Sequence, residues 1–154
     1  MNATIVIELV ALFLSGLLAG EEFVVRYGVQ PALSALPDLP HVLARQSLVR
    51  RLRILVPALM VPTVLVSVAA LVAGGTGAGA GFRWAALVAL VAFLGFSFLG
   101  TVPINIRVND WTPDAPPADW KDVVRRWERI DVFRSSAAVL AFALALVAFA
   151  LDLA

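Results

Sequence analysis

The stretch WAALVALVAFLGFSFLGTVPI, residues 84–104, contains no charged residue. A helix needs roughly 20 apolar residues to cross the core of a bilayer. Three further stretches are similarly apolar, at residues 3–19, 54–73 and 137–151. The whole chain has 154 residues, 61% of them hydrophobic, against about 45–50% in soluble domains. The sequence therefore predicts an all-α protein, a four-helix transmembrane bundle forming a single domain over residues 1–154.

The first apolar stretch differs from a cleaved signal peptide. No basic residue precedes it, and Gly20-Glu21-Glu22-Phe23 follows it in place of a small-residue cleavage site. We therefore expect a retained helix. The chain has no cysteine, which excludes disulfides, thiolate metal sites and thiol redox chemistry.

The twelve Lys and Arg residues indicate the topology, because they lie around two of the three connections between apolar stretches. Those around the first and third connections are Arg26, Arg45, Arg50, Arg51, Arg53, Arg107, Lys121, Arg125, Arg126, Arg129 and Arg134, and Arg83 alone lies near the second. Basic residues favour the cytoplasmic side. We expect an inner (plasma) membrane protein with both termini outside and the first and third connections in the cytoplasm. This topology accounts for the basic residues, so we do not expect the protein to bind nucleic acid.

Helix boundaries follow from breakers and caps. The first helix is expected to continue to Tyr27, before Gly28 and Pro31 end it. Residues 37–41 predict a turn, and residues 42–53 a short helix leading into the second membrane helix. Pro57 and Pro62 are expected to bend that second helix.

The last helix is expected to begin in the cytoplasm and to enter the membrane. Asp119 is placed to cap it, and nothing interrupts the pattern from Trp120 to Asp152. About 33 residues at 1.5 Å each give roughly 50 Å, which exceeds the ~30 Å apolar core.

Polar residues follow one side of the first and third helices. Glu8, Ser15, Glu22 and Arg26 fall within about 40° of each other at 100° per residue, and Glu22 and Arg26 have the spacing of an ion pair. The third helix carries a stripe with a spacing of four: Ser97, Thr101, Asn105 and Asn109. Charged residues in membrane helices usually face the bundle interior, so these stripes predict inward-facing groups.

The fourth helix completes the predicted site. Trp120, Trp127, Asp131 and Arg134 share one face. All three stripes meet at the cytoplasmic membrane boundary, where we expect a pocket with an apolar floor and a charged rim. The charged and amide groups predicted to converge there are Glu22, Arg26, Asn105, Arg107, Asp131 and Arg134.

Several of these features also have a structural interpretation. The alternative interpretation of the ion pairs is that they are neutralised structural pairs, and that of the Ser/Thr/Asn stripe is that it joins helices. Arg83, Trp84 and Trp111 are interpreted as interfacial anchors. Glu8 and Asp152 are expected to be solvated near the outer surface, and His41 is interpreted as a residue of a loop turn.

The chain resembles the anthrone oxygenase-like family of small four-helix membrane proteins, long catalogued as a domain of unknown function. The resemblance spans nearly the whole chain. Its motifs are Arg26-Tyr27-Gly28, Gln30-Pro31-Ala32-Leu33, Leu36-Pro37, Val102-Pro103-Ile104-Asn105-Ile106-Arg107, Asp110-Trp111, Pro116-Pro117-Ala118-Asp119-Trp120, Arg126-Trp127-Glu128-Arg129 and Arg134. Similar sequences often have histidine or asparagine at the position of Asp131. If that histidine is a base or a metal ligand in the similar sequences, then either Asp131 takes over the same role in this chain or the activity of this chain differs from theirs.

The resemblance implies an oxidoreductase, linked to aromatic polyketide pathways, that oxidises a flat, hydrophobic anthrone- or hydroquinone-type molecule with O2. Such chemistry needs a base, for which Glu22 or Asp131 is suitable. It also needs groups that stabilise an oxyanion, for which Arg26, Arg107 or Arg134 is suitable. Asn105 is expected to orient the substrate. Residues expected to contact it are Trp127, Trp120, Tyr27 and Asn109.

We expect no organic cofactor, because no flavin or nicotinamide fingerprint is present. A metal ion is the less favoured alternative. Glu21 or Glu22 with Asp131, Asn105 and Asn109 offers oxygen ligands that suit iron or manganese.

The alternative to an enzyme is a protein that binds or transports a small molecule, or a helper subunit of a membrane complex. The expected partners are a hydrophobic small molecule, the lipid bilayer and a second copy of the chain in a homo-oligomer. Loss of activity without loss of fold in Glu22→Gln or Asp131→Asn distinguishes the enzyme from the other two.

Overall fold

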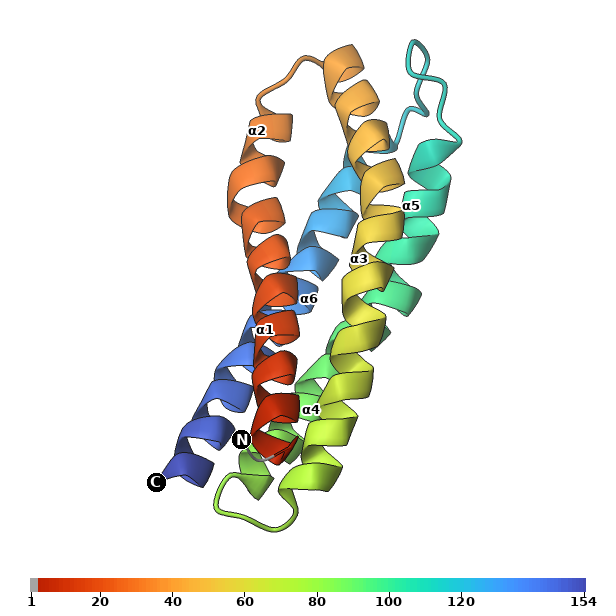
Figure 1. Cartoon of the computed structure of the whole chain (residues 1–154). Coiled ribbons are helices and arrows are strands. Elements are labelled where there is room, and N and C mark those ends of the chain that lie inside the picture. The colour runs from red at the N-terminus through yellow and green to blue at the C-terminus, as the bar shows by residue number, and fades with distance from the viewer. Residues whose placement is uncertain (1–2) are drawn as a thin grey trace.

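The computed structural model describes residues 3–154, which form four long helical stretches and contain no strand (Figure 1). The stretches are Ala3–Ser34, Asp38–Gly74, Ala80–Asn109 and Trp120–Leu153, and each is long and apolar enough to cross a membrane. The all-α class and the four helices of membrane-spanning length are therefore confirmed.

The first and third stretches each contain a π-helical segment. The first consists of α1 (Ala3–Val24), η1 (Val25–Val29) and α2 (Gln30–Ser34). The third consists of α4 (Ala80–Gly95), η2 (Phe96–Thr101) and α5 (Val102–Asn109). The prediction that Gly28 and Pro31 end the first helix was wrong, because the chain stays helical through both.

Proline explains where the wider turns occur. Pro31 follows η1 and Pro103 follows η2, each as the second residue after the segment. A proline ring clashes with the carbonyl four residues earlier and cannot donate a hydrogen bond to it. In both segments the residue before the proline donates instead to the carbonyl five residues earlier, Gln30 to Val25 and Val102 to Ser97. A π turn thus lets the helix continue past the proline.

The second stretch is a single helix. The structure has α3 (Asp38–Gly74) where a turn and a separate leading helix were predicted, and Pro57 and Pro62 both lie inside it. The last helix, α6 (Trp120–Leu153), agrees with the predicted bounds. Asp119 occupies its N-cap position, but its side chain does not cap the helix; it pairs instead with Arg107 at 2.7 Å.

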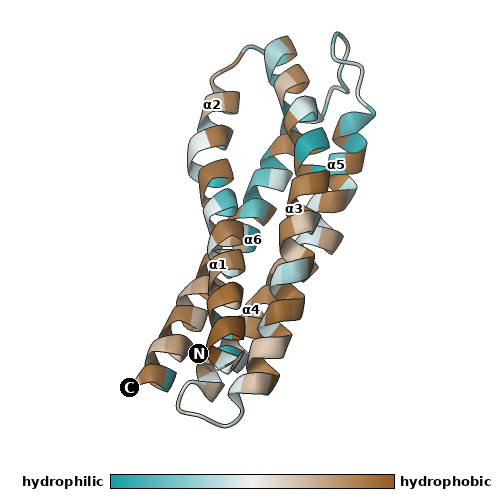
Figure 2. Ribbon diagram, in the orientation of Figure 1, coloured by the Kyte–Doolittle hydropathy of each residue, from teal (hydrophilic) through white to brown (hydrophobic). Residues whose placement is uncertain are grey.

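The two ends of the bundle differ. The start of α1, the end of α6 and the connection 75–79 lie at one end, and the connections after α2 and α5 lie at the other (Figure 1). Hydrophilic residues gather in the half of the bundle near the second end, while the other half is mostly hydrophobic (Figure 2). This polarity agrees with a bundle of which one end projects from the membrane.

The core has two parts. In the apolar half, α6 packs closely against α4 through buried alanines that include Ala89, Ala138 and Ala141, since small residues allow membrane helices to approach. In the polar half, Trp111, Trp120 and Trp127 share a core cluster with valines of several helices. Trp111 is therefore a buried core residue, and its interpretation as an interfacial anchor was wrong.

Arg83 joins three helices at the end that holds the termini. Its guanidinium pairs with Glu8 of α1 at 3.2 Å and with Asp152 of α6, and it donates to the carbonyls of Gly74 and Gly75 at the end of α3. Arg83 and Glu8 are buried. The predictions of an anchoring Arg83 and a solvated Glu8 are corrected, because both are buried and paired with each other. Asp152 also pairs with Arg83 but is an exposed residue, as predicted.

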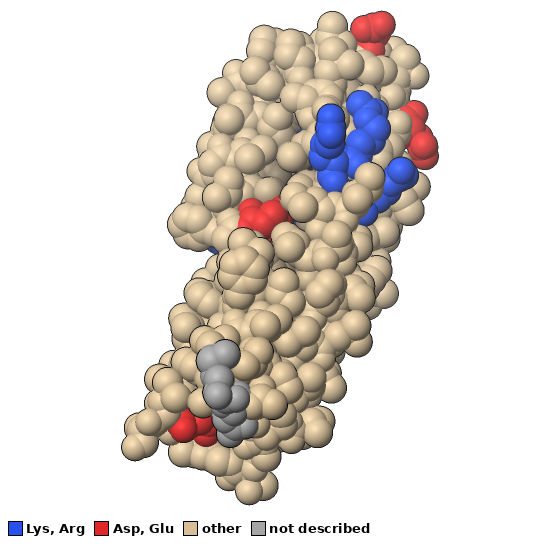
Figure 3. All heavy atoms as spheres, in the orientation of Figure 1, with Lys and Arg blue, Asp and Glu red and all other residues tan. Residues whose placement is uncertain are grey.

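The outer surface suits lipid. Leu99, Val72 and Ile54 expose 85%, 76% and 70% of their surface. Basic side chains gather over the part of α3 in the polar half of the face shown in Figure 3. Arg50, Arg51 and Arg53 of α3 are all exposed.

Candidate functional site

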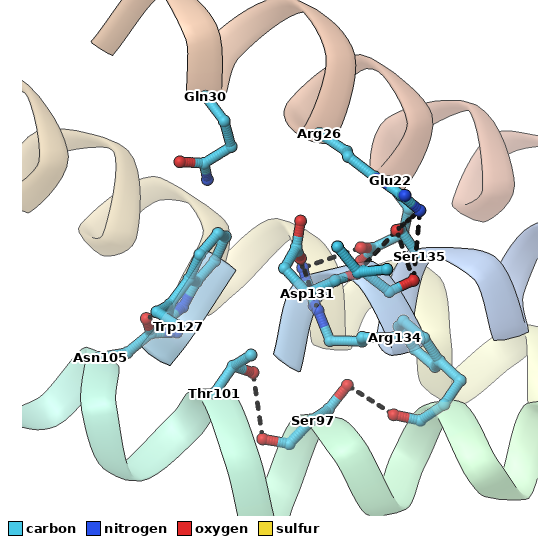
Figure 4. Close-up of polar contacts among 12 residues, drawn as sticks. Glu22, Arg26, Gln30, Ser97, Thr101, Asn105, Trp127, Asp131, Arg134 and Ser135 are labelled. Carbon is cyan, nitrogen blue, oxygen red and sulfur yellow. Dashed lines mark hydrogen bonds and ion pairs between the residues drawn. The ribbon is translucent and has the colours of Figure 1, made fainter. Parts of the chain in front are cut away.

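Arg134 is at the centre of a buried ion cluster in the middle of the bundle. It belongs to α6, and its guanidinium lies 2.8 Å from Glu22 Oε2 of α1. The same group donates two hydrogen bonds to Asp131 Oδ1, at 3.0 and 3.1 Å. Glu22 is fully buried, and Asp131 and Arg134 nearly so. The predicted Asp131–Arg134 pair is confirmed, with Glu22 as a third member (Figure 4).

Arg26 has a different partner from the one predicted. Instead of pairing with Glu22, its guanidinium reaches α6, where it donates to the Val132 carbonyl at 3.2 Å and to the Ser135 and Ser136 hydroxyls at 3.2 and 3.0 Å. The predicted Glu22–Arg26 pair was therefore wrong. Arg26 joins η1 to α6 beside the ion cluster (Figure 4).

The polar stripe of the third stretch has two kinds of residue. Ser97 and Thr101 donate to carbonyls of their own helix, at 2.8 and 3.1 Å, so they do not join helices through these bonds. Asn105 does join helices, because its Oδ1 accepts a hydrogen bond from the Trp127 indole at 2.9 Å. The next member, Asn109, has a buried side-chain oxygen with no hydrogen-bond partner.

A second buried arginine was not predicted as a site residue. Arg45 of α3 donates to His41 Nε2 at 3.1 Å and to Gln30 Oε1 at 3.0 Å, and it lies 3.4 Å from Glu128 of α6. Its guanidinium also stands 5.5 Å from the Trp127 ring centroid. The i,i+4 spacing of His41 and Arg45 on one helix was the available sequence signal, but basic residues here were assigned to topology.

Several of these groups line a cavity of about 250 Å³ between α3 and the η2–α5 segment. Its polar lining comprises Gln30, Arg45, Arg53, Ser97, Thr101, Asn105, Asn109, Asp110, Trp127 and Arg134, and the remaining lining is apolar. Typical ligand pockets measure about 300–1,000 Å³, so this cavity, at about 250 Å³, suits one small molecule.

The predicted site residues thus do not all lie together. Asn105, Asn109, Trp127 and Arg134 line the cavity. Glu22 and Asp131 lie behind Arg134, as its ion-pair partners.

The other predicted site residues lie elsewhere. Arg107 is half exposed and paired with Asp119. Trp120 packs against His41 and Trp111 in the core. Tyr27 is 58% exposed and lines a separate recess with Arg26 on the outer face of α6.

Glu21 has both carboxylate oxygens buried without a hydrogen-bond partner. Within residues 3–154, no group of three or more His, Asp or Glu side chains is arranged to hold a metal ion. The geometry of these residues therefore does not support the oxygen ligand set built on Glu21, Glu22 and Asp131.

Comparison with known proteins gives one match. The sequence model of the anthrone oxygenase family matches residues 46–144, which is well over half of the chain. The matched region contains Asn105, Trp127, Asp131 and Arg134, but not Glu22. No curated protein and no solved structure matches the chain. From the family match, together with the four long apolar helices, we conclude that the chain belongs to the anthrone oxygenase family.

Proposed function

We propose that this protein is a membrane-embedded oxygenase that oxidises a hydrophobic aromatic molecule of the anthrone or hydroquinone type with O2. The cavity between α3 and α5 is its active site. The observation that carries the proposal is a buried arginine, Arg134, on the wall of a cavity that also presents Trp127, Asn105 and several apolar side chains. Family membership supports the same reaction class.

The reaction needs little more than a base and an anion site. Removing a proton from the carbon between the rings of an anthrone leaves an anion whose charge rests largely on the phenolic oxygen. O2 takes up the electron pair at that carbon, and protonation gives a hydroperoxide. Loss of water then leaves the ketone, so one oxygen atom stays in the product and the other leaves as water. A hydroquinone instead passes two hydrogens to O2 and yields hydrogen peroxide.

Arg134 is suited to the oxyanion. A cation held in place in a site shielded from water stabilises developing negative charge strongly. Glu22 and Asp131 fix its position from behind, at 2.8 and 3.0 Å. Arg134 therefore reaches the cavity without having to reorganise when the substrate becomes charged.

Trp127 and Asn105 are suited to binding the rings. The Trp127 ring is fixed at its nitrogen by Asn105 and lies near the guanidiniums of both Arg45 and Arg134. A fixed indole offers a flat face for an aromatic substrate. The Asn109 oxygen, buried and without a partner, is available to accept a phenolic hydrogen.

Asp131 is proposed as the proton acceptor. Because it lies behind Arg134 and does not line the cavity, the proton would reach it through one intervening water molecule. Both Arg134 hydrogen bonds fall on Asp131 Oδ1, which leaves Oδ2 for the proton. General base catalysis of this kind contributes about 10²–10⁴ in rate. Asp131→Asn keeps the side-chain shape and an acceptor for Arg134 but removes the base.

The test is oxygen uptake by the purified protein in nanodiscs with anthrone as substrate, corrected for uptake in empty nanodiscs. We expect Asp131→Asn to lower kcat by at least about 100-fold. Arg125→Gln, which changes an exposed arginine paired with Asp122 outside the cavity, is the matched control and should retain wild-type turnover. Wild-type protein that binds anthrone without accelerating oxygen uptake contradicts the proposal and favours a carrier.

A further inference from the structure

The cavity has an opening on the side of the bundle. Several of its lining residues are also exposed on the outer surface: Arg53 and Pro57 on α3, and Phe98, Val102 and Ile106 on the η2–α5 segment. Phe98 and Ile106 expose 56% and 62% of their surface. The cavity therefore opens between α3 and α5, on a face whose apolar side chains suit lipid.

The cavity is elongated along the bundle. On α3 its lining runs from Arg45 to Met60, which corresponds to about 22 Å of helix at 1.5 Å per residue. One end is polar, with Asn109 and Asp110, and the other is apolar, with Met60 and Phe98. Arg53 lies between the two ends on α3.

Arg53 differs from the other arginines of the cavity. Arg45 pairs with Glu128, and Arg134 pairs with Glu22 and Asp131. Within residues 3–154 no carboxylate lies within ion-pair distance of Arg53, and this includes Asp110, the acidic residue at the polar end. The opening thus carries a cation that the protein does not neutralise.

We infer that the cavity receives its ligand sideways from the membrane, and that Arg53 makes it selective for flat aromatic molecules with an anionic substituent, such as a carboxylate or a phenolate. This inference rests on the proposed function for the aromatic class of the ligand. The rings enter between Phe98, Val102 and Ile106, and the anionic substituent stays at the opening beside Arg53. A hydrophobic acid concentrated in the membrane meets both requirements.

The physical basis is the attraction between the Arg53 cation and an anionic ligand group beside the apolar core of the membrane. A cation near the apolar core is costly unless it finds a partner, and a ligand anion supplies one. Because Arg53 is exposed, the gain is modest and resembles that of a surface ion pair. The rings supply affinity through apolar burial, and Arg53 distinguishes charged from neutral ligands.

The test measures binding, so that it does not depend on turnover. Wild-type protein and variants in neutral-lipid nanodiscs are mixed with anthraquinone-2-carboxylate or with unsubstituted anthraquinone. The bound probe is measured by absorbance after gel filtration, with empty nanodiscs subtracted. Arg53→Gln should weaken binding of the carboxylate about fivefold and leave the neutral probe unchanged. Arg51→Gln, an exposed neighbour that does not line the cavity, should change neither.

A second pair of variants tests the sideways route. Ile106→Trp places a larger side chain at the opening, whereas Leu99→Trp places the same side chain on an exposed position outside the lining. Stopped-flow association of both probes should slow about tenfold or more in Ile106→Trp and stay at the wild-type rate in Leu99→Trp. Equal rates in the two variants overturn the sideways route.

The remaining outcomes separate the inference from the proposed function. Equal loss of both probes in Arg53→Gln overturns selectivity for anions. Displacement of the carboxylate probe by anionic lipid in wild-type protein but not in Arg53→Gln assigns Arg53 to lipid headgroups and also overturns it. If the carboxylate probe binds as expected but anthrone is not oxidised, the inference holds and the proposed oxygenase fails.

Discussion

At the scale of single residues, the site depends on one arginine that two acidic side chains share as an ion-pair partner. Glu22 and Asp131 come from different helices, and both reach Arg134. All three are buried away from water, so the arginine and the two carboxylates stabilise each other's charges in place of water. Arg134 therefore contributes both to the stability of the bundle and to the charge of the cavity.

Arg134→Ala should strongly destabilise the protein. It leaves Glu22 and Asp131 buried without their cation, and breaking a buried pair typically costs about 3–5 kcal/mol. The free energy of unfolding, measured by circular dichroism in an SDS titration, should fall by about that amount. Adding Glu22→Gln and Asp131→Asn to the same chain should restore most of the loss, because neutral amides need no counter-charge. A triple variant no more stable than Arg134→Ala contradicts the shared-charge account.

Asn105→Ala should weaken substrate binding while lowering the stability of the fold only slightly. The change leaves the Trp127 indole without its 2.9 Å hydrogen bond, at a cost of about 1 kcal/mol in unfolding free energy. With the ring no longer fixed, KM for anthrone should rise several-fold. Michaelis kinetics from oxygen uptake, beside thermal unfolding of the same sample, check both effects. An unchanged KM contradicts the role of Trp127 as a fixed binding face.

At the scale of elements, the two π turns determine which side chains face the cavity. An α-helix advances by about 100° per residue, and a π turn accommodates one residue more than an α turn. The η2 segment therefore sets the angular position of everything after it, including Asn105 and Asn109 on the cavity side. A regular helix through Pro103 would also clash with the Leu99 carbonyl.

Removing the extra residue should be tolerated only at the π turn. Deletion of Leu99, combined with Pro103→Ala to remove the clash, converts η2 to an α turn and keeps α4 and α5 in register. Deletion of Val88, an exposed residue within α4, instead rotates the helix on one side of it by about 100°. We expect the first variant to retain a cooperative thermal transition and the second to lose it. Equal destabilisation of both contradicts this role for η2.

At the scale of the whole molecule, charge is arranged differently at the two ends. Near the termini, the buried Arg83 is paired with the buried Glu8 and with Asp152, an exposed residue. Near the other end, exposed arginines cover part of α3 (Figure 3). Exposed basic residues favour the cytoplasmic side, so the end with the α5–α6 connection is expected there.

Cysteine labelling tests this topology, since the chain has no cysteine of its own. Thr76→Cys lies in the connection near the termini, and Thr112→Cys in the connection before α6. In intact cells, with the outer membrane permeabilised where one is present, a membrane-impermeant maleimide should label Thr76→Cys. It should label Thr112→Cys only after lysis. The opposite pattern reverses the predicted orientation.

The sequence by itself determined the helical class, the four membrane-length stretches and the bounds of α6. These follow from hydrophobic length and from the absence of breakers, which are properties of each segment alone. The inward position of Glu22, Asp131 and Arg134 also followed from periodicity, because charges avoid lipid.

Only the tertiary structure decided which partners these side chains have. Periodicity placed Glu22 and Arg26 together on one helix, yet Glu22 pairs across helices with Arg134, and Arg26 reaches the hydroxyls of α6. Arg83 and Arg45 carried the same interfacial pattern as exposed arginines, yet both are buried and paired. The reason is physical: a pattern along one helix fixes the direction of a side chain, whereas its partner depends on which helix packs opposite and at what height.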